Sequence, residues 1–501
     1  MIQQTTPSDF AHRAPSVLGD LLALSDAHPF VDLSVSSICT DSREVTPGAV
    51  FFARAGAKHD GRQFIGQAAE QGAVAAVVAD ASQLGKAQLP IVEVQDFDAA
   101  LASASAKFFQ HPTRKLRLLG VTGTNGKTTV AHLCSEALEG VAGCGLLGTL
   151  GMGMPGALQP SMHTTPELNV TNAVLAQCVD AGCEYAVMEV SSHGIDQRRI
   201  EGLVFDTAVY TNLSRDHLDY HGDMDAYASV KAQLFEQSEL RLAIVNGDDP
   251  YAERMIRDTP TEVVRYSFSD RAGVDGVTGR VTHQVGQLTL HLDGRFGQGT
   301  ITSQLLGRFN AYNLLACATA LAGLGLPIAE VCARLGKVEP APGRMQWLGG
   351  GALPIVVVDY SHTPDALDKA LTALRESGNA KLWCVFGCGG DRDAGKRPLM
   401  GEIAELHADN VIVTDDNPRS EPSAQIIEQI LAGMRAPNSV EVEADRAKAI
   451  GMAIAASGVG DVVLIAGKGH EPYQERHGAR TAFNDLKVAR DALALKGNRD
   501  A

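Results

Sequence analysis

The segment Leu118–Val130, which reads LLGVTGTNGKTTV, constrains the fold more than any other part of the chain. An apolar run ends in a glycine-rich turn, and Lys127-Thr128-Thr129 begins a predicted helix. Backbone N–H groups of the turn, the positive end of the helix and the Lys127 ammonium would point to one place, which suits the phosphates of a nucleotide. Val121 stands where the G-x-x-x-x-G-K-[ST] pattern has its first glycine, so this loop is a variant of that pattern.

Length and charge limit the classes of protein to which this chain can belong. With 501 residues it is too long for one core and predicts three domains of about 150 residues each. A formal net charge of −16 argues against nucleic acid or an anionic membrane as a partner. A small anionic molecule needs only local positive groups and is therefore not excluded.

The cysteines and the first residues predict a protein of the cytoplasm. None of the nine cysteines forms a C-x-x-C pair, which favours reduced thiols over a metal or disulfide role. The start of the chain, MIQQTTP, has neither the basic nor the apolar part of a signal peptide. No apolar run approaches the ~18 residues of a membrane span, so we expect no membrane insertion.

Two proline-containing segments, 110–113 and 339–343, mark the expected domain boundaries. They predict domains over residues 1–112, 113–342 and 343–501. In the middle segment, short apolar runs alternate with helical patterns, which indicates a buried parallel sheet covered on both faces. The expected strands there are 116–121, 145–150, 185–190, 207–211 and 242–246.

The last segment repeats this alternation. Strands are expected at 355–358, 382–386, 411–414 and 462–466, with helices at 365–375, 424–435, 444–456 and 484–495. The predicted fold class is therefore α/β with three domains: a central doubly wound parallel sheet of the phosphate-loop type, a C-terminal Rossmann-like α/β domain and a smaller N-terminal α/β domain.

Four side chains near the phosphate loop are candidates for chemistry. Lys127 and Thr128 are expected to contact the β/γ-phosphates and Mg²⁺ respectively. Glu189 ends a buried strand, where a carboxylate is costly unless it is paired or binds metal, so a Mg²⁺ ligand is favoured over a satisfied core glutamate. His217 follows the next strand and could join it, although a lone histidine there is more often a hydrogen-bonded loop residue. Lys231 has the pattern of an ordinary lysine on a solvated helix face.

Polar motifs follow three of the C-terminal strands. They are Gly389–Asp393, Asp415–Arg419 and Gly467–Glu471. Open α/β sheets bind ligands at the carboxyl ends of their strands. Arg419 could contact a carboxylate through two parallel hydrogen bonds, and the acidic side chains suit an ammonium. Solvated polar loops would explain any one of these motifs, but they explain three together less well. The set predicts a site for a zwitterion.

Taken together, these motifs closely resemble those of the Mur ligases, the ATP-dependent amino-acid-adding enzymes of peptidoglycan precursor synthesis. The family loop G-T-x-G-K-T is present as Gly123–Thr128, and the resemblance extends over essentially the whole chain. It also includes Glu189–His193, Asn212–Asp219, the Lys231 helix, Gly307–Asn313, Pro342–Arg344 and the C-terminal loops. Asp416-Asn417-Pro418-Arg419 is similar to the motif of members that add meso-diaminopimelate. Lysine-adding members lack this arginine, which agrees with the extra carboxylate of diaminopimelate.

The resemblance implies a role for each site residue. ATP would be held by Gly123, Thr124, Asn125, Gly126, Lys127, Thr128 and Thr129, with Asn313, Arg344 and Asp359 at the nucleoside. Mg²⁺ would be held by Thr128, Glu189, His217 and Lys231, the last as a carbamate (N6-carboxylysine); Lys127, Glu189, His217 and Lys231 would be the catalytic set. The UDP-N-acetylmuramoyl dipeptide would contact Thr40, Ser42, Ala57, Lys58, His59, Thr164, Thr165, Ser191, Gln197 and Arg199. Diaminopimelate would contact Arg392, Asp416, Asn417, Pro418, Arg419, Gly467 and Glu471.

The implied reaction joins meso-diaminopimelate to the D-glutamate γ-carboxylate of UDP-N-acetylmuramoyl-L-alanyl-D-glutamate through an acyl phosphate. The cofactors would be Mg²⁺ and the co-substrate ATP. The expected partners are small-molecule substrates, and the protein is expected to be a monomer. A ligase similar to folylpolyglutamate synthase is the alternative within the same chemistry. An ATP-gated binding or switch protein is the alternative from another class, but it would not need Glu189, His217, Lys231 and an amino-acid site together.

Overall fold

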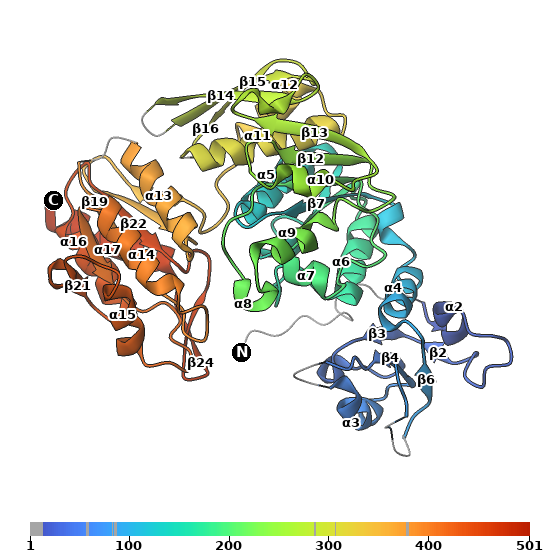
Figure 1. Cartoon of the computed structure of the whole chain (residues 1–501). Helices are drawn as coiled ribbons and strands as arrows, with labels where there is room; N and C mark the ends of the chain where they lie inside the picture. The colour runs from blue at the N-terminus through green and yellow to red at the C-terminus, as the bar shows by residue number, and fades with distance from the viewer. Residues whose placement is uncertain are drawn as a thin grey trace.

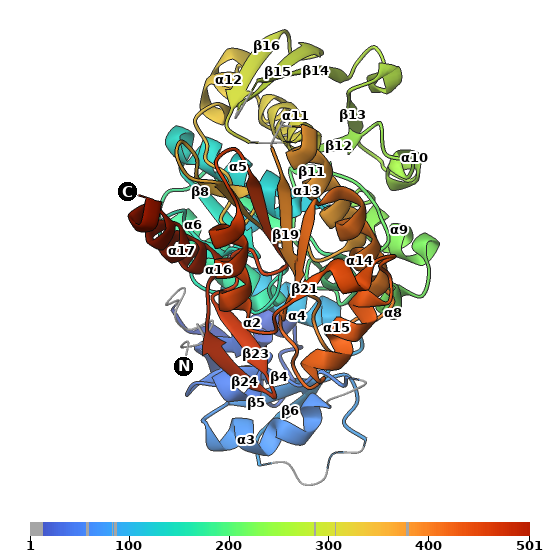
Figure 2. The ribbon, with the colours of Figure 1, turned by 90° about the vertical axis from the view of Figure 1, so that its left-hand side faces the viewer.

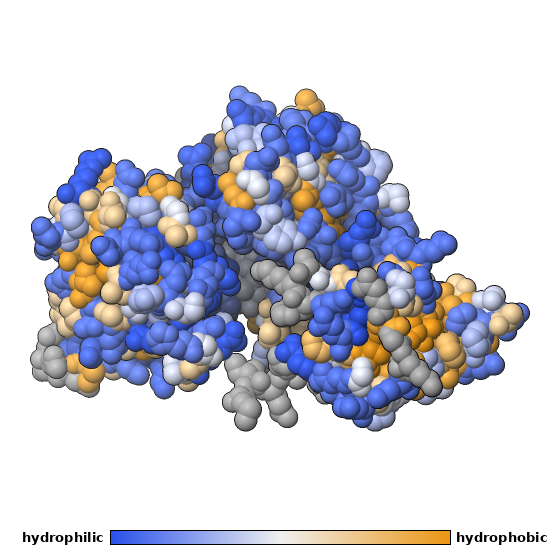
Figure 3. Space-filling view, turned by 60° about the horizontal axis from the view of Figure 1, so that its bottom comes forward, coloured by the Kyte–Doolittle hydropathy of each residue, from blue (hydrophilic) through white to orange (hydrophobic). Residues whose placement is uncertain are grey.

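The computed structural model describes residues 14–500, except 57–59, 83, 85–87, 285–286, 306 and 377–379. Three α/β parts follow one another along the chain (Figure 1). The predicted α/β fold class with three parts is thus confirmed. Among the described residues, no helix is both long and apolar enough to cross a membrane. The surface in Figure 3 is mostly hydrophilic, with smaller hydrophobic areas scattered over it.

The N-terminal part is built on a small parallel sheet with the strand order β3-β4-β5-β6. Its core strands Ala49–Phe52 and Ala75–Val78 are buried along their whole length. Asp96 begins the last long helix of this part by accepting a hydrogen bond from the Ala99 N–H at 3.0 Å. The elements are β1 (Ser16–Val17), α2 (Leu18–Leu22), β2 (Ser34–Val35), β3 (Ser37–Cys39), η1 (Ser42–Glu44), β4 (Ala49–Phe52), η2 (Gly61–Phe64), α3 (Ile65–Glu70), β5 (Ala75–Val78), β6 (Ile91–Glu93), α4 (Phe97–Phe108) and η3 (Pro112–Arg114).

The central part contains a ten-stranded sheet in the order β16-β15-β14-β13-β12-β11-β7-β10-β8-β9. The strands are β7 (Arg117–Thr122), β8 (Cys144–Gly148), β9 (Gly151–Gly153), β10 (Tyr185–Glu189), β11 (Thr207–Tyr210), β12 (Leu242–Asn246), β13 (Glu262–Ser267), β14 (Val277–Gln284), β15 (Gln287–Gly294) and β16 (Gly299–Ser303). The helices are α5 (Lys127–Ala142), α6 (Leu168–Asp180), α7 (Ser192–Asp196), α8 (Leu218–His221), α9 (Met224–Ala232), α10 (Ala252–Ile256), η4 (Asp270–Ala272), α11 (Arg308–Gly323) and α12 (Ile328–Leu335).

Successive side chains of the central strands enter two different cores, as expected for strands buried on both faces. Leu118 packs into the core that contains the α6 residues, whereas Leu119 packs into the core that contains residues of α5 and α11. The five expected strands are present, but the sheet is not wholly parallel. β14, β15 and β16 pair antiparallel at one edge, and β8 pairs antiparallel with β9 at the other.

The C-terminal part has a six-stranded sheet in the order β17-β18-β22-β19-β20-β21, parallel apart from β17. The helices α13, α14, α15, α16 and α17 lie around this sheet (Figures 1 and 2). All four expected strands and all four expected helices are present. The elements are β17 (Gln346–Gly349), β18 (Ile355–Asp359), α13 (Pro364–Glu376), β19 (Leu382–Phe386), α14 (Lys396–His407), β20 (Asn410–Val413), α15 (Ser423–Leu431), η5 (Pro437–Ser439), β21 (Glu441–Val442), α16 (Arg446–Ala456), β22 (Val462–Ala466), β23 (Tyr473–Arg476), β24 (Ala479–Ala482) and α17 (Asp485–Asp500).

Candidate active site

The phosphate loop joins the end of β7 to the start of α5, as the sequence predicts. Gly126 has a φ of +87° and lies directly before the helix, where a Cβ atom would come within 2.6 Å of the Asn313 side-chain oxygen. Glycine is therefore required by both conformation and space. Lys127 Nζ donates to the carbonyl oxygens of Gly123 at 2.7 Å and Thr124 at 2.9 Å. Burial lowers the pKa of Lys127, although Glu189 and Asp216 oppose this effect.

A buried carboxylate connects the loop to the neighbouring strand. Glu189, at the end of β10, accepts from the Thr128 hydroxyl at 2.8 Å and from the Thr149 N–H at 2.7 Å. Its partners are therefore a hydroxyl at the start of α5 and an N–H of the turn between β8 and β9. Arg344, which lies two residues before β17, donates to the Thr128 hydroxyl at 3.1 Å. One threonine at the start of α5 thus joins the buried carboxylate to a guanidinium of the C-terminal part.

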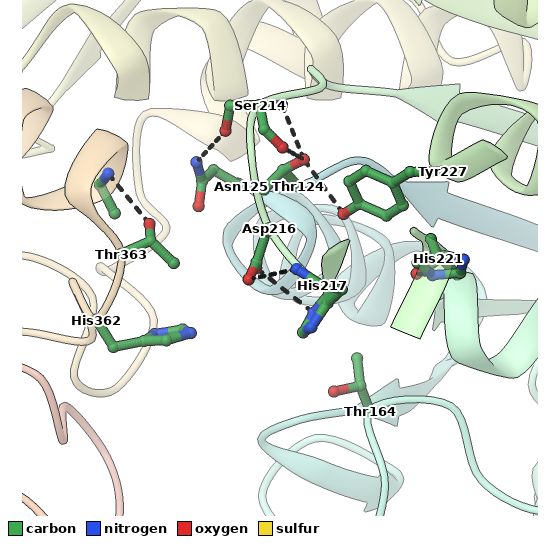
Figure 4. Close-up of polar contacts among 12 residues, drawn as sticks. Thr124, Asn125, Thr164, Ser214, Asp216, His217, His221, Tyr227, His362 and Thr363 are labelled. Atoms are coloured by element: carbon green, nitrogen blue, oxygen red, sulfur yellow. Dashed lines mark hydrogen bonds and ion pairs between the residues drawn. The ribbon is translucent and has the colours of Figure 1, made fainter. Parts of the chain in front are cut away.

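The segment after β11 lies against the phosphate loop (Figure 4). The Thr124 hydroxyl lies 3.2 Å from the Ser214 carbonyl oxygen, to which it donates, and 3.3 Å from Tyr227 OH. Asn125 Nδ2 donates to Asp365 Oδ2 at 2.7 Å, and the Ser214 hydroxyl donates to the same atom at 3.1 Å. Because Asp365 belongs to α13, one carboxylate oxygen of the C-terminal part holds two groups of the central part.

His217 and Asp216 form a pair beside this loop. His217 Nε2 lies 3.4 Å from Asp216 Oδ2, and His217 has the left-handed φ of +55°. Desolvation lowers the pKa of His217 to about 4, and the Asp216 carboxylate opposes this effect. In Figure 4, His217 of the central part and His362 of the C-terminal part lie on either side of one space.

Lys231 is buried, which corrects the expectation of a solvated helix face. It is 1% exposed, and its Nζ donates to the Gly123 carbonyl oxygen at 3.0 Å. It also lies 4.7 Å from the centre of the Tyr227 ring. Desolvation and the nearby Lys127 ammonium lower its pKa well below the usual range. The sequence pattern of α9 could not reveal this, because the surface that covers Lys231 comes from the phosphate loop.

The residues expected to hold the muramoyl dipeptide form a connected group. The Thr165 hydroxyl donates to the Glu189 carbonyl oxygen at 2.9 Å and accepts from the Ser191 N–H at 2.9 Å. Thr149 connects Glu189 to Thr164, because its hydroxyl lies 3.4 Å from the Thr164 hydroxyl. Arg199 joins this group through Nη2, which donates to Gln197 Oε1 at 2.6 Å, and through Nη1, which donates to the Thr165 carbonyl oxygen at 2.9 Å.

Two residues expected at the uridine end lie in the N-terminal part and make separate contacts. Thr40 donates to Asn169 Oδ1 of the central part at 3.3 Å, and Ser42 donates to Gln67 Oε1 at 3.0 Å. They share no hydrogen bond with the group around Thr165. The expected residues Ala57, Lys58 and His59 lie outside the described residues.

The three residues expected at the nucleoside come from helix α11, from the end of strand β18 and from the segment before β17. Asn313 of α11 lies against Gly126, and its amide nitrogen donates to Asn310 Oδ1 at 3.0 Å. Asp359, at the end of β18, accepts from the Met345 N–H at 2.7 Å and from the Ser361 hydroxyl. Arg344 lies over the Tyr360 ring at 4.5 Å. Asp359 therefore fixes the backbone directly after Arg344.

The three C-terminal motifs meet because β22, β19 and β20 are adjacent and parallel. Arg419 Nη1 donates to the Gly390 carbonyl oxygen at 2.7 Å, and Asn417 Nδ2 donates to Glu471 Oε2 at 2.8 Å. Asp416 lies beside Gly467, where a Cβ atom would come within 2.4 Å of its Oδ2. The expected amino-acid residues are thus brought together, except that the contact found for Arg392 is with the carbonyl oxygen of its neighbour Asp391 at 3.0 Å.

Sequence reasoning missed two charged residues at these sites. Asp216 is partly buried beside His217; desolvation alone would raise its pKa, but nearby cationic groups, Lys127 and Lys396 among them, outweigh this and lower it. Lys468 is fully buried and donates to Asn417 Oδ1 and Glu471 Oε2, both at 2.9 Å. Asp216 lies in the motif Asn212–Asp219 and Lys468 in the motif Gly467–Glu471. Their place in these motifs, next to residues that were chosen as candidates, was the only sequence signal that could have identified them.

The loop that carries Arg419 is also fixed by an ion pair, whose pH dependence can be predicted. Arg397, which is 1% exposed, donates to both carboxylate oxygens of Glu421 at 2.8 Å. This pairing lowers the pKa of Glu421 from 4.5 to about 2. The pair therefore contributes stability above pH 4.5, and this contribution is lost as the pH falls towards 2. We expect Glu421→Gln to lower Tm by roughly 2 °C at pH 7.

Thermal unfolding between pH 7 and pH 3 tests this prediction. The difference in Tm between wild type and Glu421→Gln should shrink as the pH falls below 4.5. The exposed Glu428 offers a matched control, because Glu428→Gln should show no such pH dependence. A constant difference in Tm across this range would contradict the prediction.

The donor set beside the phosphate loop fits Mg²⁺ only in part. Mg²⁺ is usually bound by one or two carboxylates together with substrate phosphates. Glu189 and the Thr128 hydroxyl, 2.8 Å apart, are such donors at the start of α5. Among the described residues, no group of three or more His, Cys, Asp and Glu side chains is close enough to hold a metal ion alone. Thr128 and Glu189 could hold Mg²⁺ together with the oxygens of a bound nucleotide.

Models of one protein family match the three parts of the chain in order. "Mur ligase family, catalytic domain" matches residues 34–109, "Mur ligase middle domain" matches 121–321, and "Mur ligase, glutamate ligase domain" matches 343–469. The chain belongs to the Mur ligase family. The resemblance seen in the sequence is thereby confirmed.

Curated relatives in this family match nearly the whole chain. A UDP-N-acetylmuramoyl-L-alanyl-D-glutamate--2,6-diaminopimelate ligase of Pseudomonas aeruginosa is 47% identical over 92% of this chain and 96% of its own. A protein of the same name from Coxiella burnetii is 41% identical over 95% of this chain and 99% of its own.

Solved Mur ligase structures share the fold. One, titled as the structure of a UDP-N-acetylmuramoyl-L-alanyl-D-glutamate--2,6-diaminopimelate ligase, has a TM-score of 0.70 and 34% identity over 97% of this chain and all of its own. A folylpolyglutamate synthase of Mycobacterium tuberculosis in complex with ADP has a TM-score of 0.60 at 23% identity. It covers 73% of this chain and 91% of its own. This second likeness concerns the fold alone.

Proposed function

We propose that this Mur ligase adds meso-diaminopimelate to the γ-carboxylate of UDP-N-acetylmuramoyl-L-alanyl-D-glutamate, with conversion of ATP to ADP and phosphate. The observation that carries the proposal is the junction at Thr128, where the phosphate loop, the buried Glu189 and Arg344 of the C-terminal part meet. The 47% identity to a ligase named for these substrates supports the choice of acceptor and amino acid.

Each part of the chain would bind one reactant. We assign the UDP-substrate to the domain 1–112, ATP to the domain 113–342 and the amino acid to the domain 343–501. The uridine end would contact Thr40, Ser42, Ala57, Lys58 and His59, and the dipeptide would contact Thr164, Thr165, Ser191, Gln197 and Arg199. Diaminopimelate would contact Arg392, Asp416, Asn417, Pro418, Arg419, Gly467 and Glu471.

ATP would occupy the loop residues Gly123–Thr129. Asn313, Arg344 and Asp359 would contact its nucleoside side. The Lys127 ammonium, which now donates to two loop carbonyls, would turn to the β- and γ-phosphate oxygens and offset their charge. Thr128 and Glu189 would hold Mg²⁺ together with the phosphates, with His217 beside them. When bound, this ion would neutralise charge that develops on the transferred phosphoryl group.

Lys231 would carry a carbamate, and the burial of its side chain favours this modification. CO₂ reacts with a neutral amine, and desolvation together with Lys127 favours the neutral form of Lys231. The ammonium first loses one proton; the neutral nitrogen then forms a bond to the carbon of CO₂ and loses a second proton, so that a cation is replaced by an anion. A negative charge at this place is favoured by the neighbouring Lys127 ammonium, whereas a positive one is not.

The reaction would then proceed in two steps. A γ-carboxylate oxygen of D-glutamate attacks the γ-phosphorus, the bond to the ADP oxygen breaks, and an acyl phosphate forms. The amine of diaminopimelate attacks the acyl carbon, loses a proton, and phosphate leaves from the tetrahedral intermediate. The chain's contribution is mainly positioning, and contacts such as Arg344–Thr128 between two parts would help to exclude water from the acyl phosphate.

Phosphate release tests the proposal directly. The protein is incubated with ATP, Mg²⁺ and UDP-N-acetylmuramoyl-L-alanyl-D-glutamate, and with meso-diaminopimelate, L-lysine or no amino acid. We expect release only with diaminopimelate. Release with lysine alone would retain the ligase reaction but overturn the choice of amino acid. No release with either would overturn the proposal, and a folate-type acceptor would be tested next.

A further inference from the structure

Lys468 is a buried lysine whose ammonium contacts two residues of the candidate amino-acid site, Asn417 and Glu471. Its side chain is fully buried between the ends of β22 and β20. Nζ donates to Asn417 Oδ1 and Glu471 Oε2 at 2.9 Å each, and it lies 4.0 Å from Asp416 Oδ1. A buried charge persists only when it is paired and hydrogen-bonded, so these three contacts account for its presence.

The contact with Lys468 determines how the Asn417 amide is oriented. Asn417 Oδ1 accepts from Lys468 Nζ and from the Glu475 N–H, both at 2.9 Å. Because two donors face this oxygen, the amide nitrogen must point the other way, where it donates to Glu471 Oε2 at 2.8 Å. Among the described residues this nitrogen donates to no second acceptor, so its other hydrogen could bind a ligand carboxylate.

The charge of Lys468 also sets the balance of the pocket. Its neighbours Asp416 and Glu471 carry two negative charges, and Lys468 offsets one of them. The adjacent Asp415 is paired separately with Arg476 at 2.6 Å. Arg419 and Arg392 are the other two cations of the predicted site. Without the Lys468 charge the net charge beside Asp416 and Glu471 would be one unit more negative, which would suit a ligand end with a single ammonium better than a zwitterionic one.

We infer that Lys468 is a positioning and specificity-determining residue: its buried ammonium orients Asn417 and balances the pocket so that an amino acid with a zwitterionic end is preferred over one that ends in an ammonium. This inference rests on the proposed function. Lys468 does not itself need to touch the amino acid, since it acts through Asn417 and Glu471.

The test compares kcat/KM for meso-diaminopimelate and for L-lysine in wild type and Lys468→Met. Methionine keeps the length of the side chain but removes its charge. We expect kcat/KM for diaminopimelate to fall about tenfold or more, because charge-assisted hydrogen bonds are lost. The preference for diaminopimelate over lysine should fall with it, whereas KM for ATP should stay unchanged. An unchanged preference in folded Lys468→Met would overturn the inference.

Two further variants separate this role from a structural one. Lys468→Arg keeps the charge and should retain most of the preference, even if Lys468→Met does not fold; loss of the preference in folded Lys468→Arg with unchanged KM for ATP would count against charge balance. Lys448 is a matched control, because it lies exposed in the same domain and Lys448→Met should behave as wild type. If wild type releases no phosphate with diaminopimelate, the proposed function fails, and that outcome is distinct from failure of the Lys468 inference.

Discussion

Lys231→Ala is expected to reduce ligation by roughly a thousandfold while the chain stays folded. The lysine is buried against the Gly123 carbonyl, and the variant removes the nitrogen on which the proposed carbamate forms. Without the carbamate, the net charge beside the phosphates is one unit more positive. The measurement is phosphate release with all three substrates present, together with Tm to establish that the variant is folded.

Rescue by a small carboxylate makes this test specific. Acetate or formate, added in the millimolar range or above, should partly restore activity to Lys231→Ala by occupying the place of the carbamate. Lys115→Ala is a matched control, because Lys115 is exposed and should be neutral in both assays. Near-wild-type turnover of Lys231→Ala without any added carboxylate would end the carbamate hypothesis.

Arg419→Ala is expected to lower kcat/KM for diaminopimelate by roughly a hundredfold and to change kcat/KM for lysine little. The guanidinium of Arg419 donates to the Gly390 carbonyl oxygen, and the backbone N–H of Arg419 donates to the Glu475 carbonyl oxygen. These contacts orient a guanidinium that can bind a second carboxylate, which diaminopimelate has and lysine lacks. Steady-state kinetics with the two amino acids measure the change.

Two other arginine variants sharpen this prediction. Arg419→Lys keeps the charge but loses the planar pair of donors, so it should recover only part of the preference. Arg435→Ala removes an exposed arginine of the same domain and should leave both values unchanged. Equal losses for diaminopimelate and lysine in Arg419→Ala would show that the arginine does not read the second carboxylate.

The parallel strands and the phosphate loop could be predicted from the sequence because their signals are local. Strand Tyr185–Glu189 is a continuous apolar run that ends in a carboxylate, and Gly126-Lys127 marks the start of a helix. The antiparallel edge was missed, although Leu288, Leu290 and Leu292 alternate with polar residues and are buried. This alternation is the usual mark of a strand with one covered face.

The residues of the candidate site could be predicted only where they belong to a recognisable sequence motif. In the sequence, Lys231 has the pattern of a surface lysine. Its contact with the phosphate loop cannot be seen there, because that loop lies more than a hundred residues away. Lys468 and Asp216 were overlooked for the same reason, since each is defined by the charges that other elements bring to it. Pairing between distant segments is what a single sequence does not contain.

The single oxygen of Asp365 that accepts from both Asn125 and Ser214 has a thermodynamic consequence for the whole cycle. Docking of the C-terminal part and ordering of the phosphate loop are linked equilibria, and such linkage is reciprocal. Any factor by which nucleotide favours docking must equally be the factor by which docking tightens nucleotide. A variant that weakens the Asp365 contact would therefore reduce both effects by the same factor.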